Sequence, residues 1–384
     1  MNTKLLGSSL IISGTALGAG MLAIPMVLAQ FGLLHGTLLM LLIYAGTTYA
    51  ALLLLEATIK TGDGLGLNSI ARMVLGKSGQ IVSNALLYAL LICLLMAYIL
   101  GAADFVIQIL GSVGVSLTAV QSQILFTLVA GAVVAPGTTL IDRLNRIFFL
   151  VMLLSLASSL LLLAPNLSFE SLFQVSNSDQ IALIKTSAVL FTSFGFMVVI
   201  PSLVAYNQEA TDKQLRNMVI IGSTIPLICY LCWLFAVVGN LQLDQLGNFH
   251  NVSDLMRAFE AHSPWISGIL SVFTGLALLT SFFGVAMALF HQNTDTFRQN
   301  KFVTYLITFI APLIGALLAA EQFLSILSYA GIILVFLAVF VPLLLVYKLR
   351  EREVSSDRYS AEGGRAMLII TLLFGVFLLV SQII

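Results

Sequence analysis

Charged residues are scarce in this sequence. Asp, Glu, Lys and Arg make up 9% of the 384 residues, against roughly 25% in an ordinary soluble domain, and hydrophobic residues make up 59%. The mean hydropathy is +1.06. So few charges cannot cover the surface of a soluble protein of this length. The composition therefore excludes a soluble protein and predicts a polytopic, all-α integral membrane protein with the lipid bilayer as its surroundings.

Groups that could perform chemistry are also scarce. A membrane-embedded enzyme would need His, Cys, Asp or Glu clustered at midplane depth, and only scattered single groups occur. A channel would need a continuous polar stripe or a charged ring, and the sequence has neither. Cys229 and Cys232 lie in an apolar segment, where we expect them to pack rather than to act as a redox pair. The sequence indicates no enzyme, no cofactor, no metal site and no nucleic-acid partner, and it leaves the oligomeric state open.

Apolar stretches of about 20 residues, the length that crosses a bilayer, recur along the whole chain. We predict eleven transmembrane spans and expect short surface helices in the longer loops 60–80 and 240–264. The predicted spans are 5–31, 35–59, 81–110, 121–139, 147–164, 182–207, 217–239, 265–291, 302–320, 323–347 and 366–384.

Basic residues gather on one side of the predicted spans. Lys4 and the loops after every second span carry 15 of the 17 Lys and Arg residues. Cytoplasmic loops are enriched in these residues, so this side is expected in the cytoplasm. With an odd number of spans, the N-terminus is then cytoplasmic and the C-terminus periplasmic.

Glycines interrupt the first span near its middle. Gly14, Gly18 and Gly20 fall within seven residues of an otherwise apolar run. Glycine weakens a helix, and in lipid every freed N–H and C=O group needs a partner inside the protein. Such a break favours a solute site lined by opened backbone. The alternative is that Gly14 and Gly18, four residues apart, serve close helix packing.

The sixth span carries a second interruption, at Thr192 to Phe196, with Pro201 after it. Gly195 holds the position in spans 6–10 that Gly18 holds in spans 1–5. The chain is therefore expected to contain two five-helix repeats, and because five is odd the second repeat is inverted. The predicted units are 1–164 (spans 1–5), 165–347 (spans 6–10) and 348–384 (a cytoplasmic loop and an accessory eleventh span).

Three motifs resemble the hydroxy/aromatic amino acid permeases. They are Gly14-Thr-x-x-Gly18-Ala-Gly20-Met-Leu-Ala-x-Pro25, Thr192-Ser-Phe-Gly-Phe196, and Gly137-Thr-x-Leu-x-Asp142-x-x-Asn145-Arg146. The resemblance runs from about residue 5 to the last span. It implies a bacterial inner-membrane protein with a LeuT-type 5+5 inverted repeat, discontinuous helices 1 and 6, and an eleventh helix.

The same resemblance implies proton-driven import of an aromatic amino acid, with tyrosine first. Sodium coupling, another aromatic or hydroxy amino acid (tryptophan, phenylalanine, serine or threonine) and a non-transporting amino acid sensor stay open. Two positions depart from the family. Its tyrosine and tryptophan members usually have His-Gly where this chain has Met197-Val198, and some proton-coupled relatives have a lysine where this chain has Met152. Both departures concern the proton route and leave the fold unaffected.

An amino acid zwitterion needs hydrogen-bond donors for its carboxylate and acceptors for its ammonium group. The backbone amides of residues 16–20 are expected to supply the donors. The carbonyls of residues 191–194, with two hydroxyls, are expected to supply the acceptors. We expect Tyr98 to reach the ligand carboxylate and the phenylalanines to contact the ligand side chain, and the alternative is that these residues only pack. The predicted substrate-binding residues are Gly14, Thr15, Ala16, Gly18, Ala19, Gly20, Tyr98, Thr192, Ser193, Phe194, Gly195, Phe196 and Phe282.

Four residues are candidates for ion coupling. Asp104, in the outer part of span three, could accept a proton if it is buried, or could be an anion of the outer vestibule. Glu56 precedes Lys60 by one helical turn, which favours an ion pair over a proton relay. Thr280 and Ser281 in span eight, with carbonyls of span one, could form a sodium site. Spans 1, 2, 6 and 7 are expected to move as a bundle against spans 3, 4, 8 and 9.

Overall fold

The computed structural model describes residues 3–62, 65–134, 138–175, 177–242, 245–246, 249, 252–260, 264–297, 300–319, 323–352 and 358–384. Within these ranges every regular element is a helix. Eight helical stretches there are long and apolar enough to cross a membrane, and two shorter apolar helices accompany them. The chain is a multi-pass membrane protein, as its composition predicts.

Each of the eleven predicted spans overlaps an apolar helical stretch. The smaller count arises because the stretch Gly20–Thr61 joins parts of the first two predicted spans. In addition, α1 (Thr3–Ala16), α5 (Ala119–Val134) and α17 (Gly364–Val380) are each shorter than 18 residues. The number eleven and the accessory role of the last helix stay predictions.

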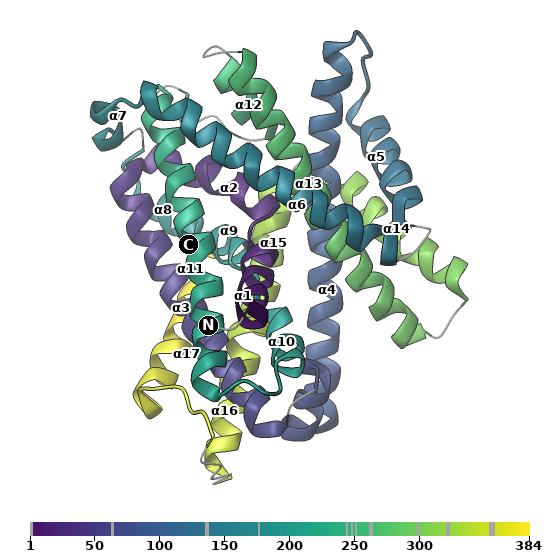
Figure 1. Cartoon of the computed structure of the whole chain (residues 1–384), viewed down its shortest axis with the longest axis vertical. Coiled ribbons are helices and arrows are strands. Elements are labelled where there is room, and N and C mark those ends of the chain that lie inside the picture. The colour runs from purple at the N-terminus through teal and green to yellow at the C-terminus, as the bar shows by residue number, and fades with distance from the viewer. Residues whose placement is uncertain are drawn as a thin grey trace.

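The helix α4 (Leu67–Ser112) is the central column of one group of helices and runs most of the height of the molecule (Figure 1). Near its start, Gly76 adopts φ 79° and interrupts the helix, so a short helical segment stands in the loop where one is predicted. The helices α5, α13 (Pro264–Phe297), α14 (Lys301–Leu318) and α15 (Phe323–Val335) pack against α4. The helix α6 (Thr138–Leu163) packs along α13.

A second group surrounds the two interrupted spans. The helix α1 packs along α11 (Asp212–Asn240), and α3 (Gly32–Thr61) contacts α9 (Ser187–Ser193), α10 (Ile200–Tyr206) and α11. The two groups meet where α2 (Ala19–Leu28) touches α13 and where α9 packs against α15. The remaining elements are η1 (Ala29–Phe31), η2 (Ala164–Asn166), α7 (Phe169–Phe173), α8 (Gln180–Lys185), η3 (Met197–Val199), α12 (Val252–Glu260), the π-helical turn η4 (Phe336–Phe340) and α16 (Val341–Glu351).

Short helices mark the two ends of the molecule. The helices α7 and α12 lie at one end and α16 lies at the opposite end (Figure 1). The helix α12 falls in the 240–264 loop, where a surface helix is predicted. The sequence-based topology also places α7 and α12 on one side and the loop after α16 on the other. Which side faces the cytoplasm stays a prediction.

Candidate functional site

The first predicted helix break is present in the structure. The helix α1 ends at Ala16 and α2 begins at Ala19, with Gly18 in an extended conformation between them. The Leu17 amide donates to the Ser13 carbonyl at 2.8 Å and closes α1, while the Met21 amide donates to Gly18 at 3.0 Å and opens α2. The first amides of a helix have no partner within that helix. The amides of Ala19 and of the next residue therefore have no acceptor within α2.

The second predicted break is also present. The helix α9 ends at Ser193, and the chain resumes helical structure at η3 and then α10. The Phe194 amide donates to the Phe191 carbonyl at 3.1 Å, and the Gly195 amide donates to Thr192 at 3.0 Å. The Phe191 and Thr192 carbonyls therefore accept hydrogen bonds within this segment, whereas the Ser193 carbonyl needs a donor from outside α9.

The two breaks lie against each other. A methyl group on Gly20 would come within 2.8 Å of the Ser193 Cα atom, so only glycine permits this approach of α2 to α9. The Ser193 hydroxyl donates to the Gly20 carbonyl at 3.0 Å. The donors at the start of α2 and the acceptors at the end of α9 therefore share one buried junction.

Tyr230 of α11 joins the ends of both broken helices. Its side chain is fully buried, and its hydroxyl oxygen lies 2.7 Å from the Ala16 carbonyl oxygen and 2.7 Å from the Ser193 carbonyl oxygen. These carbonyls end α1 and α9, so the negative ends of two helix dipoles converge on one phenol. Tyr230 was missed in the sequence analysis because nothing in the apolar pattern of its span distinguishes it.

The helices α13 and α4 complete the junction. A methyl group on Gly18 would come within 2.1 Å of the Ser281 side-chain oxygen, so α13 packs directly on the first break. Ser281 in turn hydrogen-bonds the buried Tyr98 of α4. Two residues predicted for different roles, Tyr98 for substrate and Ser281 for coupling, therefore lie together.

The predicted phenylalanines occupy different places. Phe194 and Phe196 are fully buried at the second break. The Phe194 ring packs edge-on against Tyr230, with 5.1 Å between ring centroids, and lies 6.1 Å from the ring of Tyr44. Phe194 is therefore part of the junction.

Phe282 belongs to a separate aromatic cluster. Its ring centroid lies 5.0 Å from that of Phe126 on α5 and 6.1 Å from that of Phe309 on α14. It also meets its neighbour Phe283 at 6.2 Å. The cluster fills the space between α13, α5 and α14.

Several predicted hydroxyl groups bond to their own helices. Thr15 is exposed and donates to the Ile11 carbonyl at 2.8 Å. Thr192 donates to Ala188 at 2.8 Å and also lies 3.1 Å from the Leu327 carbonyl of α15. Thr280 donates to the carbonyl one turn earlier at 2.8 Å. Such bonds satisfy a hydroxyl locally and leave less of it for a ligand.

Gly14 faces away from the junction. A methyl group on it would come within 3.1 Å of the Phe149 ring on α6. This contact favours the packing alternative for Gly14. The side chain of Ala19 lies outside the described residues.

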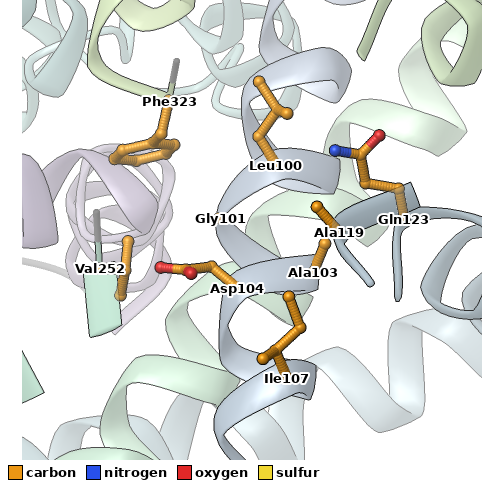
Figure 2. A pocket seen from close by; sticks show the side chains of 9 residues that line it. All are labelled: Leu100, Gly101, Ala103, Asp104, Ile107, Ala119, Gln123, Val252 and Phe323. Carbon is orange, nitrogen blue, oxygen red and sulfur yellow. The ribbon is translucent and has the colours of Figure 1, made fainter. Parts of the chain in front are cut away.

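Asp104 borders a cavity of about 60 Å³ at the C-terminal half of α4 (Figure 2). Its carboxylate points towards Val252, the first residue of α12. A cavity of this size has room for water. The cavity is lined by Leu100, Gly101, Ala103, Asp104, Ile107, Ala119, Gln123, Val252 and Phe323.

Glu56 is fully buried and held by two cations. Lys60 contacts its carboxylate at 2.8 Å, which confirms the predicted ion pair. Arg350 of α16 donates to both carboxylate oxygens, at 2.9 and 2.6 Å, and the Ala361 amide donates at 2.8 Å. The arginine lies far away in sequence, so no local pattern could indicate it. These partners make Glu56 an anchor between α3, α16 and the segment before α17.

A polar cavity of about 150 Å³ lies at the start of α1 and the end of α10. Both ends belong to the interrupted spans, on the side predicted to be cytoplasmic. The cavity is lined by Lys4, Leu5, Asn207, Glu209, Ala210 and Gln214.

A model of the tryptophan/tyrosine permease family matches residues 1–382. The chain belongs to this family. It is therefore an amino acid transporter of the membrane and not an enzyme, and the resemblance drawn from the helix-break motifs is confirmed.

The names of similar proteins state different substrates. The chain is 58% identical to glutamine transporter 2 of Aliivibrio fischeri, over 100% of both chains. It is 35% identical to tyrosine-specific transport system 1 of Haemophilus influenzae, over 98% of this chain and 95% of that one. It is 30% identical to a tryptophan-specific transport protein of Pseudomonas aeruginosa, over 99% and 94%.

Replacing Gly18 with leucine is expected to abolish amino acid uptake while the protein still inserts, because the new side chain would collide with Ser281. Uptake into proteoliposomes, normalised to inserted protein, measures the effect. Gly7→Leu on the same helix is the matched control, since nothing lies within 4 Å of a Cβ atom placed there. Wild-type uptake by the Gly18→Leu variant would contradict the assignment of the junction.

Replacing Glu56 with glutamine is expected to destabilise the protein by about 3 kcal/mol or more, because two cations lose their buried anion. Thermal unfolding in detergent measures the loss. Glu362→Gln is the control, because that carboxylate is 79% exposed and pairs with Arg216 at 3.2 Å, so its loss should cost less than about 1 kcal/mol. Equal melting temperatures of the two variants would refute the anchoring role.

Proposed function

We propose that the protein imports a neutral amino acid across the bacterial inner membrane by proton-coupled alternating access. The observation that carries this proposal is the junction of the two helix breaks, where the first amides of α2 meet the terminal carbonyls of α1 and α9. A zwitterion requires donors and acceptors close together, and backbone groups provide both without a buried charge.

The helix ends suggest how the ligand is oriented. The carboxylate binds the amides of Ala19 and Gly20, at the positive end of the α2 dipole. The ammonium group binds the carbonyls of Ala16 and Ser193, at the negative ends of α1 and α9. The junction is too tightly packed around Gly18 to hold a ligand as it stands. Binding therefore requires α1 and α2 to separate from α13, which is the movement expected of a bundle against a scaffold.

Helix packing supports the inverted repeat. When spans 1–5 are exchanged with spans 6–10, three pairs of helix contacts correspond to each other. The helix α1 packs on α11 while α9 and α10 pack on α3, and α4 packs on α15 while α13 packs on α6. The helix α4 also contacts α14 as α13 contacts α5. A polypeptide made of two equivalent five-helix units has this property.

Glutamine is the first substrate to test, in place of the tyrosine expected from the motifs. The relative named as a glutamine transporter shares 58% of its residues with this chain, against 35% for one named as tyrosine-specific. Beside the second break, Met197-Val198 departs from the aromatic permeases. The Phe194 ring is already packed against Tyr230 and Tyr44, and the hydroxyls of Tyr98 and Ser281 suit a carboxamide, which both donates and accepts. Tyrosine is the second candidate.

Asp104 is the better of the two carboxylates for proton coupling. Glu56 is committed to Lys60 and Arg350, and protonating it would leave both cations without their partner. Asp104 borders a cavity with room for water, from which a proton can arrive. Sodium coupling through Ser281 and the carbonyls of α1 is the alternative.

Uptake of labelled glutamine and tyrosine into proteoliposomes tests the function, with proton and sodium gradients imposed separately. We expect glutamine uptake that the proton gradient alone can drive, with tyrosine a weaker substrate. A sodium requirement would move the coupling site to Ser281. Absence of uptake and of counterflow for every amino acid tested would indicate a sensor and refute the transport proposal.

Replacing Asp104 with asparagine tests the coupling route. The amide cannot carry the proton, so uptake should no longer respond to an imposed proton gradient. Uptake at matched internal and external pH should persist in this variant. Gln123→Ala, in the wall of the same cavity, is the control and should keep the gradient response. An unchanged response in the Asp104→Asn variant would exclude the residue.

A further inference from the structure

Tyr230 lies where the ammonium group of a bound amino acid is proposed to lie. Its hydroxyl oxygen is 2.7 Å from both the Ala16 and the Ser193 carbonyl oxygens, which is hydrogen-bond distance to each. A phenol has one proton and can fully satisfy one of them at a time, whereas an ammonium group has three N–H donors. The phenol therefore occupies the position proposed for the ammonium group and supplies one of the hydrogen-bond donors that this group would supply.

The need for such a group follows from burial. Ala16 and Ser193 are both buried, and each ends a broken helix, so their carbonyls cannot bond within those helices. A buried carbonyl without a donor is costly, and here the dipoles of two helices add to the same negative end. A closed but empty junction is thus unfavourable unless the protein supplies a donor of its own.

The ring contacts of Tyr230 do not depend on its hydroxyl group. Tyr230 is fully buried, and the Phe194 ring contacts it edge-on, with 5.1 Å between centroids and 73° between ring planes. A phenylalanine at position 230 would keep these ring contacts. The hydroxyl alone can therefore be removed without opening a cavity in the core.

We propose that the Tyr230 hydroxyl replaces the ammonium group of the amino acid in the empty transporter, so that the carrier can close and return without substrate. This inference rests on the proposed function. Net uptake requires the empty carrier to reorient, whereas exchange of internal for external amino acid requires only the loaded carrier to do so. Tyr230 is therefore a positioning residue that permits net uptake.

The test is the Tyr230→Phe variant in proteoliposomes, with labelled L-glutamine and L-tyrosine as probes. Net uptake into empty vesicles should fall about tenfold, the effect expected when one buried hydrogen bond is lost. Exchange into vesicles preloaded with the same amino acid should stay within about twofold of wild type, because the ligand itself supplies the donors. The ratio of net uptake to exchange is the readout, and a general loss of structure would not change it.

Tyr44→Phe is the matched control. The Tyr44 hydroxyl also bonds to α11, at 2.7 Å from the Thr224 side-chain oxygen, but it meets no helix end. The ratio should be unchanged in this variant. An equal fall of net uptake and exchange in Tyr230→Phe, or no fall in either, would overturn the inference while the function stood. A wild-type protein that neither takes up nor exchanges any amino acid would overturn the proposed function and this inference with it.

Discussion

A helix that is broken inside a membrane protein must find partners for its freed backbone groups within the protein, because lipid offers none. In this structure two broken helices share one solution. The carbonyls that end α1 and α9 converge on the hydroxyl of Tyr230, and the start of α2 lies against the end of α9. Small residues permit this approach, and polar side chains and the Phe194 ring fill the space around it.

Close approach explains the separate roles of the glycines in the first span. Gly18 and Gly20 each stand where a single methyl group would collide with a neighbour, the first with Ser281 and the second with the backbone of Ser193. Gly14 packs instead on Phe149 of α6. One glycine-rich segment thus combines the two roles, helix packing and backbone opening, that the sequence left as alternatives.

The two carboxylates considered for ion coupling, Glu56 and Asp104, lie in different surroundings. Glu56 is surrounded by Lys60, Arg350 and a backbone amide, so its charge is compensated and it ties together elements that are distant in sequence. Asp104 stands beside a cavity at the opposite half of the molecule, near the start of α12. Compensation makes Glu56 structural, while Asp104 borders a space that has room for water.

The sequence by itself determined the membrane class, the approximate position of the apolar helices, both helix breaks and the family. Each of these follows from local composition, from glycine and proline placement or from short motifs, so neighbouring residues suffice to predict it. The tertiary structure alone decided which polar groups meet. Three contacts join segments that are far apart in the chain: Tyr230 with Ala16, Arg350 with Glu56, and Ser281 with Gly18. Phe282 lies outside the junction, in a cluster with Phe126 and Phe309. Such contacts depend on how helices pack in three dimensions, and the periodicity of a uniformly apolar helix does not reveal which of its faces turns towards a partner.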